Sequence, residues 1–285
     1  MDKTECEDFE IELLLDVIKQ TYDYDFRHYS RASLKRRLLH RMKKSKLNRL
    51  SEMIPLVLHD KNFFELMLED LSISVTEMFR DKAVFRIIRE EITSKLKTYP
   101  RVNVWHVGCS TGEEVYSLAI LLKEEGLLDK TRIYATDFNR RFLASAEKGI
   151  YSAKKIDDYS QAYLDSGGKT SFSTYYRKAY DSIIMNDELR RNITFAHHNL
   201  VKDGSFAEMH LILCRNVLIY FDTHLQNLVL TLLHGSLIRR GFLVLGDKET
   251  LSFTTVKSGF EEFSPSNRVY RKLDAAISEY AIDDI

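Results

Sequence analysis

The segment 102–114 contains the residue types best suited to binding a nucleotide-like ligand. An apolar run leads directly into a turn with Gly108 and Gly112, and glycine lets a ligand approach the backbone closely. Either Ser110 or Thr111 can cap the apolar helix that follows. A strand, a tight turn and a helix N-terminus form the ligand cradle of a doubly wound α/β fold, although an ordinary strand-to-helix turn can have the same pattern.

Two later segments favour the cradle. Residues 132–137 predict a second strand ending in Asp137, at the position where such folds bind ribose hydroxyls. Residues 211–222 contain another apolar strand followed by Arg215 and Asn216, polar residues that are costly to bury unless they are used. Because ligands in open α/β sheets bind at the carboxyl ends of the strands, the three segments indicate one crevice.

Two common nucleotide motifs are missing from the sequence. It contains neither the dinucleotide fingerprint G-x-G-x-x-G nor a phosphate loop ending in Gly-Lys-Ser/Thr. One glycine turn and one acid for ribose, without a phosphate cradle, favour a nucleoside ligand over a dinucleotide or a triphosphate. The neighbours His197 and His198 point to opposite sides of a strand, which argues against a metal site.

These motifs together resemble those of the CheR-type chemoreceptor glutamate O-methyltransferases. The order and spacing match, and the resemblance covers about residues 8–272, with its motifs at 108–114, 116–117, 136–137, 199–200 and 214–222. Residues 76–81 resemble the segment that joins the two domains of that family. The chain departs from the family pattern at Val115, where proline is usual, at Ser74, where asparagine is common, and at residues 246–249. None of these departures removes a group needed for methyl transfer.

The resemblance implies both a fold and a reaction. It implies an all-α N-terminal domain over residues 1–75 and a class I S-adenosylmethionine-dependent methyltransferase (Rossmann-like) α/β domain over residues 76–285, with a small antiparallel β insert at about 149–191. The implied reaction transfers a methyl group from S-adenosylmethionine to glutamate carboxylates of a chemoreceptor-like protein. Its products are glutamate methyl esters and S-adenosylhomocysteine. Whether the insert docks a receptor-tail peptide, as in some members, stays open.

The resemblance also implies which residues form the site. The expected cofactor-binding residues are Ser74, Thr76, Arg80, Gly108, Glu113, Asp137, Asn199, Leu200, Arg215 and Asn216. Arg80 and Tyr220 are the expected catalytic residues: a guanidinium that holds a carboxylate and a phenol near the methyl group. A glutamate side chain is already ionised at pH 7, so the reaction needs positioning rather than a general base.

Each of these residues also has a purely structural explanation. Arg80 could pair with the neighbouring Asp81, and Tyr220 could be a core residue with a satisfied hydroxyl. Asp137 could serve only as a helix cap. An acid such as Glu113 stabilises a helix N-terminus whether or not it binds a ligand. The family resemblance favours the functional interpretation in each case.

The composition is consistent with a two-domain enzyme in a reducing cytoplasm. A chain of 285 residues with 44% hydrophobic content can bury one large core and one smaller core. Its net charge of zero argues against a wholesale nucleic-acid binder. The three cysteines lack metal spacing, and no apolar run approaches the roughly 20 residues that a membrane span requires.

A basic region stands out in this neutral chain. Ten lysines and arginines and no acid lie between Arg27 and Arg49, including Lys35, Arg36, Arg37, Arg41, Lys43 and Lys44. A charge run is commonly a solvated helix face, and nucleic-acid binding is a second option. In the resembled family the corresponding helix faces the receptor's acidic methylation region. We therefore expect Lys35, Arg36, Arg37 and Arg41 to dock the cytoplasmic region of a chemoreceptor-like protein, with no nucleic acid involved.

Two other classes of function stay open at this stage. One is an S-adenosylmethionine-dependent methyltransferase that acts on another protein or a small molecule, which should not need the basic helix or the insert. The other is a cofactor-sensing regulatory module without catalysis. The presence of Arg80, Asp137, Asn216 and Tyr220 argues against the second class.

Overall fold

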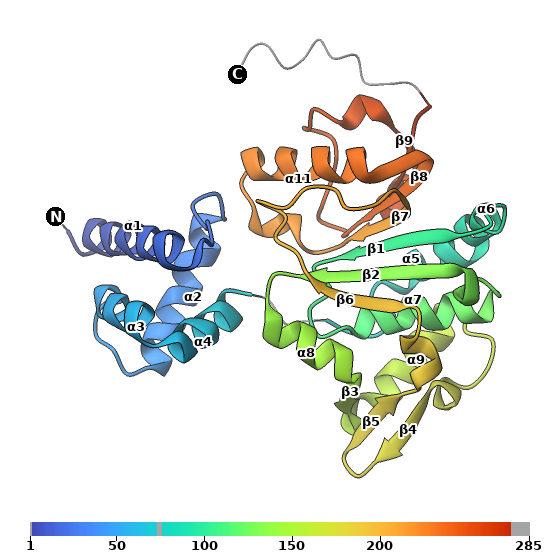
Figure 1. Ribbon diagram of the computed structural model, residues 1–285, viewed down its shortest axis with the longest axis horizontal. Coiled ribbons are helices and arrows are strands. Elements are labelled where there is room, and N and C mark those ends of the chain that lie inside the picture. Colours follow the sequence, from blue (N-terminus) through green and yellow to red (C-terminus); the bar gives the residue numbers. More distant parts are fainter. Residues whose placement is uncertain (1, 73–75, 275–285) are drawn as a thin grey trace. The chain divides into compact units, whose positions relative to one another are not determined.

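The computed structural model describes residues 2–72 and 76–274. The chain divides into two compact units, coloured along the sequence in Figure 1. Residues 1–74 together with 219–226 form the first, here called the helical unit. Residues 75–218 together with 227–285 form the second, here called the sheet unit. No helix among the described residues is both long enough and apolar enough to cross a membrane.

The helical unit is built from amphipathic helices: α1 (Lys3–Tyr22), α2 (Arg31–Lys44), α3 (Met53–His59) and α4 (Lys61–Leu71). A capping box starts α1, because Asp2 accepts from the Glu5 backbone and Glu5 accepts from the Asp2 backbone. Apolar residues at helical spacing then bury one face of α1, at Ile11, Leu14, Leu15 and Ile18. These side chains form the core of the unit, as the helical pattern of the sequence predicts.

A segment distant in sequence completes the helical unit. The backbone N–H of Ser30 donates to the carbonyl of Tyr220 at 2.8 Å, and that of Asp222 donates to the carbonyl of His28 at 2.9 Å. The Tyr29 and Phe221 rings pack edge to face with centroids 5.0 Å apart. The eight residues 219–226 are thus folded with helices that precede them by almost two hundred positions.

The sheet unit contains a seven-stranded sheet in the order β6-β2-β1-β7-β8-β10-β9. Its strands are β1 (Val102–Val107), β2 (Thr131–Asp137), β6 (Ile193–His197), β7 (Met209–Cys214), β8 (Leu237–Leu245), β9 (Phe260–Ser264) and β10 (Val269–Lys272). The first five strands of this order run parallel, whereas β10 is antiparallel to both β8 and β9. The strands predicted at 102–107, 132–137, 192–195 and 211–214 are present, and the predicted α/β class is confirmed.

Helices cover the sheet (Figure 1). They are α5 (Lys82–Ile87), α6 (Thr93–Leu96), α7 (Glu113–Glu124), α8 (Arg140–Lys148), α10 (Asp187–Arg190) and α11 (Thr223–Ser236). A π-helical turn at Ile88–Ile92 joins α5 to α6. Helix α7 is buried over most of its length, from Glu113 to Leu122, and it packs with α8 against β2.

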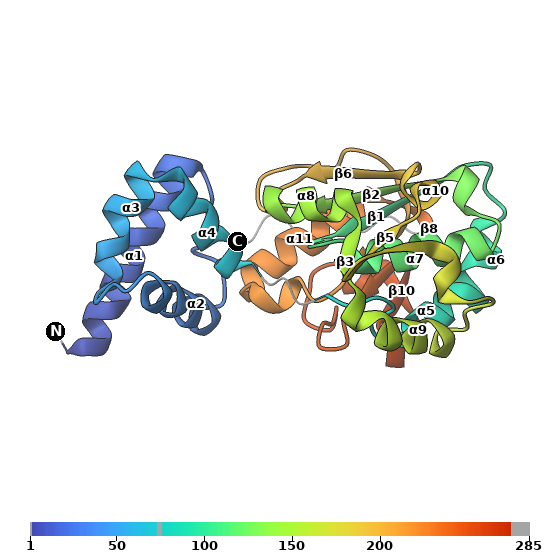
Figure 2. The same cartoon turned by 90° about the horizontal axis from the view of Figure 1, so that it is seen from below.

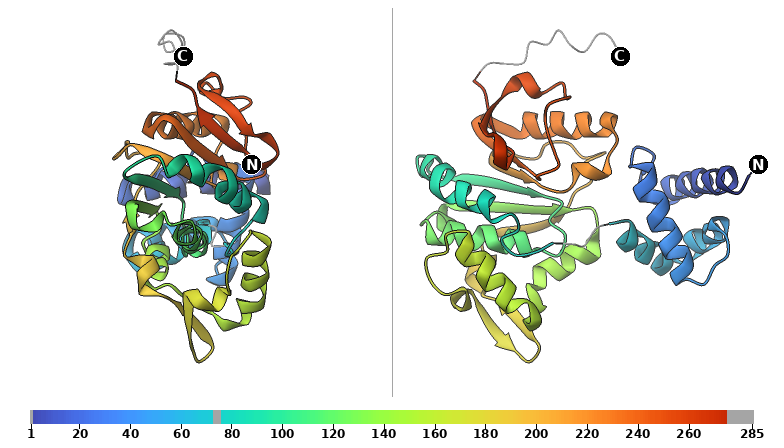
Figure 3. Two further views of the ribbon diagram at one scale, coloured as in Figure 1. Left: turned by 90° about the vertical axis from the view of Figure 1, so that its right-hand side faces the viewer. Right: turned by 180° about the vertical axis from the view of Figure 1, so that it is seen from behind.

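A second, three-stranded antiparallel sheet confirms the predicted β insert. It contains β3 (Ile150–Ser152), β5 (Ser182–Met185) and β4 (Tyr176–Ala179) in that order, and α9 (Ile156–Asp165) belongs to the same segment. Figure 2 shows β3 and β5 beside α8 and α9, and in Figure 3 the β4–β5 hairpin projects away from the large sheet. Buried Glu124 anchors the insert, because the Tyr163 and Tyr175 hydroxyls both donate to it.

Candidate active site

The order of the strands defines where a ligand would bind. The chain proceeds from β1 outward to β2 and β6, then returns to β7 on the other side of β1. The topological switch point therefore lies between β1 and β7, and in such sheets the binding crevice opens beyond the carboxyl ends of the strands there. Here we call this side of the sheet the carboxyl edge.

The turn that follows β1 can be built only with glycine. Gly108 has φ +63°, and a Cβ at this position would come within 2.6 Å of a methyl group of Val217. Gly112 has φ +91°, and its Cβ would come within 2.9 Å of Ala146. The turn therefore keeps backbone close to the crevice without side chains that would fill it.

The expectation that Ser110 or Thr111 caps the helix after this turn is wrong. The N-cap of α7 is Gly112, and no side chain caps the helix. The Thr111 hydroxyl instead donates to Glu113 at 2.6 Å. Ser110 is buried in a left-handed conformation, and its hydroxyl has no hydrogen-bond partner among the described residues. Because a buried polar atom is costly without a partner, this hydroxyl favours a polar ligand in the turn.

Asp137 ends β2 and holds the turn in place. One carboxylate oxygen accepts from the Ser110 backbone at 2.9 Å, and the other accepts from the Asn139 backbone at 2.8 Å. Burial raises the pKa of Asp137 to about 6 despite these hydrogen bonds. The two backbone hydrogen bonds fix the position of the buried Asp137 carboxylate, and its raised pKa makes it a stronger hydrogen-bond acceptor. It is therefore suited to accept hydrogen bonds from ligand hydroxyls.

A buried charge network lies beneath the turn. Arg215 pairs with Glu114 at 2.6 Å, and Glu114 also lies 3.1 Å from Nε2 of His106. Burial alone would raise the pKa of Glu114, but Arg215 and His106 outweigh it and lower that pKa. The Glu114 carboxylate therefore has a charged internal partner. Burial raises the pKa of Glu113, whose carboxylate accepts a hydrogen bond only from the Thr111 hydroxyl among the described residues.

The same arginine fixes the segment that contains Arg80. The Arg215 guanidinium donates to the Arg80 carbonyl at 3.2 Å and pairs with Asp81. Phe79 and Asp81 both have φ +54°, an uncommon conformation for residues other than glycine. Buried Phe79 is held by its ring contacts and by a backbone hydrogen bond of 2.8 Å to Ser117. The sequence-predicted Arg215 thus contacts protein groups that surround Arg80.

Glu249 shapes the turn after β7, a role that the motifs did not reveal. Its buried carboxylate accepts from the backbones of Asn216, Val217 and Leu218 at 2.7–3.0 Å, and from the Gly246 backbone at 2.6 Å. This clamp holds Asn216 in a left-handed conformation with φ +59°. A lone acid shortly after an apolar strand is the signal that the sequence offers, but three of its four partners lie more than thirty residues away.

The other residues that the sequence predicts for the site differ in their burial and in the unit to which they belong. Asn199 and Leu200 are half-buried just after β6, where the Asn199 side chain accepts from the Val201 backbone at 3.0 Å. Thr76 is half-buried in the sheet unit, and Ser74 lies outside the described residues. Tyr220 belongs to the helical unit, where the Cζ atom of Arg37 lies 5.2 Å from its ring centroid. The structure thus brings Gly108, Glu113, Asp137, Arg215 and Asn216 to the carboxyl edge.

The basic helix α2 is less free than its sequence suggests. Arg41, expected on the docking face, is buried and bonds to Asp70 and to the Leu66 carbonyl, so that expectation is wrong. Lys35 pairs with Asp8 at 2.9 Å, and Arg37 donates to the Leu71 carbonyl at 2.8 Å. The exposed members are Arg36, Lys43 and Lys44. A surface depression on this helix is lined by Ala32, Lys35, Arg36, Leu39, His40 and Lys43.

Fold and site together define a class I S-adenosylmethionine-dependent methyltransferase with an all-α N-terminal region. The glycine cradle, the unpartnered Ser110 hydroxyl and buried Asp137 fit the nucleoside part of that cofactor. Family models agree: residues 74–266 match the CheR methyltransferase, SAM binding domain, and residues 10–72 match the CheR methyltransferase, all-alpha domain. The chain belongs to the CheR methyltransferase family and uses S-adenosylmethionine.

Relatives in several bacteria support the assignment. A Pseudomonas putida protein named Cher3 is 48% identical over 265 residues, covering 93% of this chain and 97% of the relative. A chemotaxis protein methyltransferase of Listeria innocua is 27% identical, covering 82% of this chain and 87% of the relative. A 104.1 kDa uncharacterised protein of Rhodobacter capsulatus is 28% identical over 91% of this chain but only 27% of its own length.

Proposed function

We propose that this protein methylates glutamate side chains of a chemoreceptor-like protein and produces glutamate methyl esters. The observation that carries the proposal is a family match that spans both units, with homologues named chemotaxis protein methyltransferase. The charge of the substrate is consistent with it. A glutamate carboxylate is ionised at pH 7, so the chain need not supply a general base.

The carboxyl edge would hold the cofactor. Asp137 would accept hydrogen bonds from the ribose hydroxyls, the turn at Gly108 would leave room for the nucleoside, and Asn199 and Leu200 would complete the nucleoside pocket. Thr76, Glu113 and Asn216 belong to the same binding set, as does Ser74, which lies outside the described residues. When bound, S-adenosylmethionine supplies a methyl group activated by a positively charged sulfur.

The two catalytic assignments concern orientation. The guanidinium of Arg80 holds a carboxylate, and Arg215 acts through Arg80 by fixing its backbone and Asp81. The phenol of Tyr220 orients the reacting groups. Holding two reactants in line and excluding water can contribute roughly 7–11 kcal/mol to a reaction of this kind. In this proposal these residues act by positioning, and no general base is needed.

Base-labile labelling is the direct test of this function. The full chain is incubated with methyl-labelled S-adenosylmethionine and a chemoreceptor cytoplasmic fragment, and the product is treated with mild base. Release of labelled methanol identifies glutamate esters, and a fragment with its methylated glutamates replaced by alanine is the matched control. Base-stable label would indicate another acceptor, and no transfer with retained cofactor binding would favour a cofactor-sensing module.

Removal of one hydroxyl separates orientation from binding. We expect Tyr220→Phe to lower kcat about tenfold, the equivalent of one hydrogen bond of about 1.4 kcal/mol, with S-adenosylhomocysteine affinity unchanged. Parallel loss of rate and affinity would reassign Tyr220 to cofactor binding. Full activity would remove it from the mechanism.

Charge reversal on the exposed part of α2 tests the docking partner. The exposed cations Arg36 and Lys43 would steer an acidic receptor surface, so methylation should weaken as salt rises. Arg36→Glu with Lys43→Glu should raise the receptor KM while cofactor affinity stays constant. Retention on DNA or RNA that the double variant loses would instead indicate a nucleic-acid surface.

A further inference from the structure

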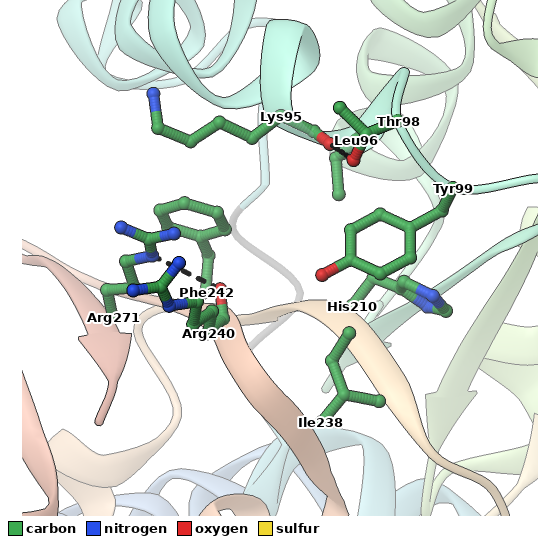
Figure 4. A pocket seen from close by; sticks show the side chains of 9 residues that line it. All are labelled: Lys95, Leu96, Thr98, Tyr99, His210, Ile238, Arg240, Phe242 and Arg271. Atoms are coloured by element: carbon green, nitrogen blue, oxygen red, sulfur yellow. Dashed lines mark hydrogen bonds between the residues drawn. The ribbon is translucent and has the colours of Figure 1, made fainter. Parts of the chain in front are cut away.

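A cavity lies at the opposite edge of the large sheet from the proposed cofactor site. It encloses about 230 Å³, and Figure 4 shows its walls. The lining residues come from the segment before β1, the start of β7, the first half of β8 and from β10: Lys95, Leu96, Thr98, Tyr99, His210, Ile238, Arg240, Phe242 and Arg271. They lie at the amino ends of the parallel strands, together with the carboxyl end of antiparallel β10, so we call this side the amino edge.

The cavity is strongly cationic. Its nine lining residues include Lys95, Arg240 and Arg271 but no carboxylate. The carboxylates that pair with the two arginines lie outside the lining and in solvent: Asp274 is 3.0 Å from Arg240, and Glu261 is 3.5 Å from Arg271. Both members of the Arg240–Asp274 pair are exposed, and the Arg271–Glu261 pair joins a half-buried cation to an exposed acid. Ion pairs open to solvent contribute little free energy, so an anionic ligand can compete with them.

The backbone is distorted where the cavity forms. Arg240 has φ +62°, a left-handed conformation that is unfavourable for an arginine. The β7–β8 ladder shifts register between Met209 and Leu211, and a Cβ on Gly241 would come within 3.0 Å of the Ile238 carbonyl. Bulges of this kind re-aim side chains and are frequent beside binding sites. The irregularity places His210 and Arg240 in the wall of one cavity.

The rest of the cavity wall contains aromatic rings and one neutral hydrogen-bond donor. The Tyr99 and His210 rings pack edge to face with centroids 4.6 Å apart, and Phe242 lies under the Arg271 guanidinium. Nδ1 of His210 accepts from the Asn103 backbone at 3.1 Å, so the ring proton is on Nε2. Burial lowers the pKa of His210, which keeps this ring neutral. It can therefore donate one hydrogen bond without adding charge.

We propose that this cavity is a second ligand site, which binds the phosphate group of a small phosphorylated molecule that also has a flat ring. Arg240 and Arg271 present planar guanidinium groups, which suit the oxygens of a phosphate, and Lys95 adds a point charge. Tyr99, His210 and Phe242 then pack around the ring of the ligand. Nothing in the methyl-transfer chemistry requires this site, so the proposal is independent of the reaction.

Calorimetry with phenyl phosphate tests the site on the full chain. The active site is first saturated with S-adenosylhomocysteine, which keeps the carboxyl edge out of the measurement. We expect saturable binding of one phenyl phosphate per chain, weaker binding of inorganic phosphate, and no measurable binding of phenol. Phosphate bound as tightly as phenyl phosphate would overturn the part of the proposal that assigns a ring to the ligand.

Variants at three elements locate the binding. Arg240→Asn, Arg271→Gln and Lys95→Gln should each weaken phenyl phosphate binding at least tenfold, and asparagine tolerates the left-handed backbone of position 240. Arg239→Asn is the matched control, because Arg239 is exposed on the same strand but does not line the cavity, and it should leave affinity unchanged. Absence of saturable binding, or binding that survives all three substitutions, would overturn the proposal.

Discussion

The two edges of the large sheet handle charge in opposite ways. At the carboxyl edge Asp137, Glu249 and Glu114 are buried, and each contacts specific protein partners: Asp137 with backbone N–H groups, Glu249 with four of them, and Glu114 with Arg215. At the amino edge Arg240 is solvent-exposed and its carboxylate partner is exposed too. Burial makes an unpaired charge expensive, whereas solvent makes it nearly free. The carboxyl edge should therefore be rigid, and the amino edge tolerant of substitution.

The largest expected effect is the loss of a buried cation. Arg215→Met leaves Glu114 buried without its main partner, which should lower the free energy of unfolding by about 3–5 kcal/mol. Urea unfolding followed by circular dichroism measures the change. Adding Glu114→Gln should recover part of the loss. A decrease of less than about 1 kcal/mol would contradict the view that this edge depends on paired buried charge.

Asp137 should have the next largest effect, on binding. Asp137→Ala removes the acid proposed to bind the ribose hydroxyls and should weaken S-adenosylhomocysteine by about 1.5–3 kcal/mol. Calorimetry measures the affinity. Because Asp137 also holds the turn, Asp137→Asn serves as the companion variant that keeps one acceptor oxygen. Unchanged affinity in a folded alanine variant would falsify the site.

The raised pKa of Asp137 predicts a smaller, pH-dependent effect. With the pKa at about 6, the carboxylate is ionised and fully accepting above that pH and becomes protonated as the pH falls through it. Affinity for S-adenosylhomocysteine should therefore be constant above pH 7 and about tenfold weaker at pH 5. The same titration of Asp137→Asn should show no such step. A step that persists in this variant would assign the proton to another group.

The smallest expected effect is at the amino edge. Arg240→Asn removes one cation, as Arg215→Met does, but here the side chain is exposed and its ion pair with Asp274 is screened by solvent. We expect the free energy of unfolding to change by less than about 0.5 kcal/mol in the same urea experiment. A loss comparable with that of Arg215→Met would erase the distinction between the two edges.

Local patterns in the sequence predicted much of the carboxyl edge. The strand at 102–107, the Gly108 turn and the acid at the end of β2 are each legible within about ten residues, and the structure has all three. The sequence predicts an insert at about 149–191, and its small antiparallel sheet lies there. Strand and turn signals depend on neighbours in the chain, which explains why they could be found without a structure.

What the sequence concealed depends on contacts between distant residues. The partners of Arg215 include Glu114, about one hundred positions away, and Glu249 contacts a turn more than thirty positions before it. Arg41 belongs to the same run of basic residues as its exposed neighbours on α2, yet its side chain is buried. Whether a charged side chain is buried is decided by tertiary packing, which a charge run does not encode.

The eight residues 219–226 limit how the two units can be exchanged between genes. They follow the Glu249-clamped turn of the sheet unit directly, yet they fold with the helical unit through Tyr29, Ser30 and His28. A gene fragment ending at residue 74 would lack them, and a fragment beginning at residue 75 would carry Phe221 without its packing partner. The two units therefore cannot be exchanged between genes as separate cassettes at their linear boundary. Recombination that preserves both folds has to transfer the two units together, because the sheet unit resumes at Asn227, within helix α11.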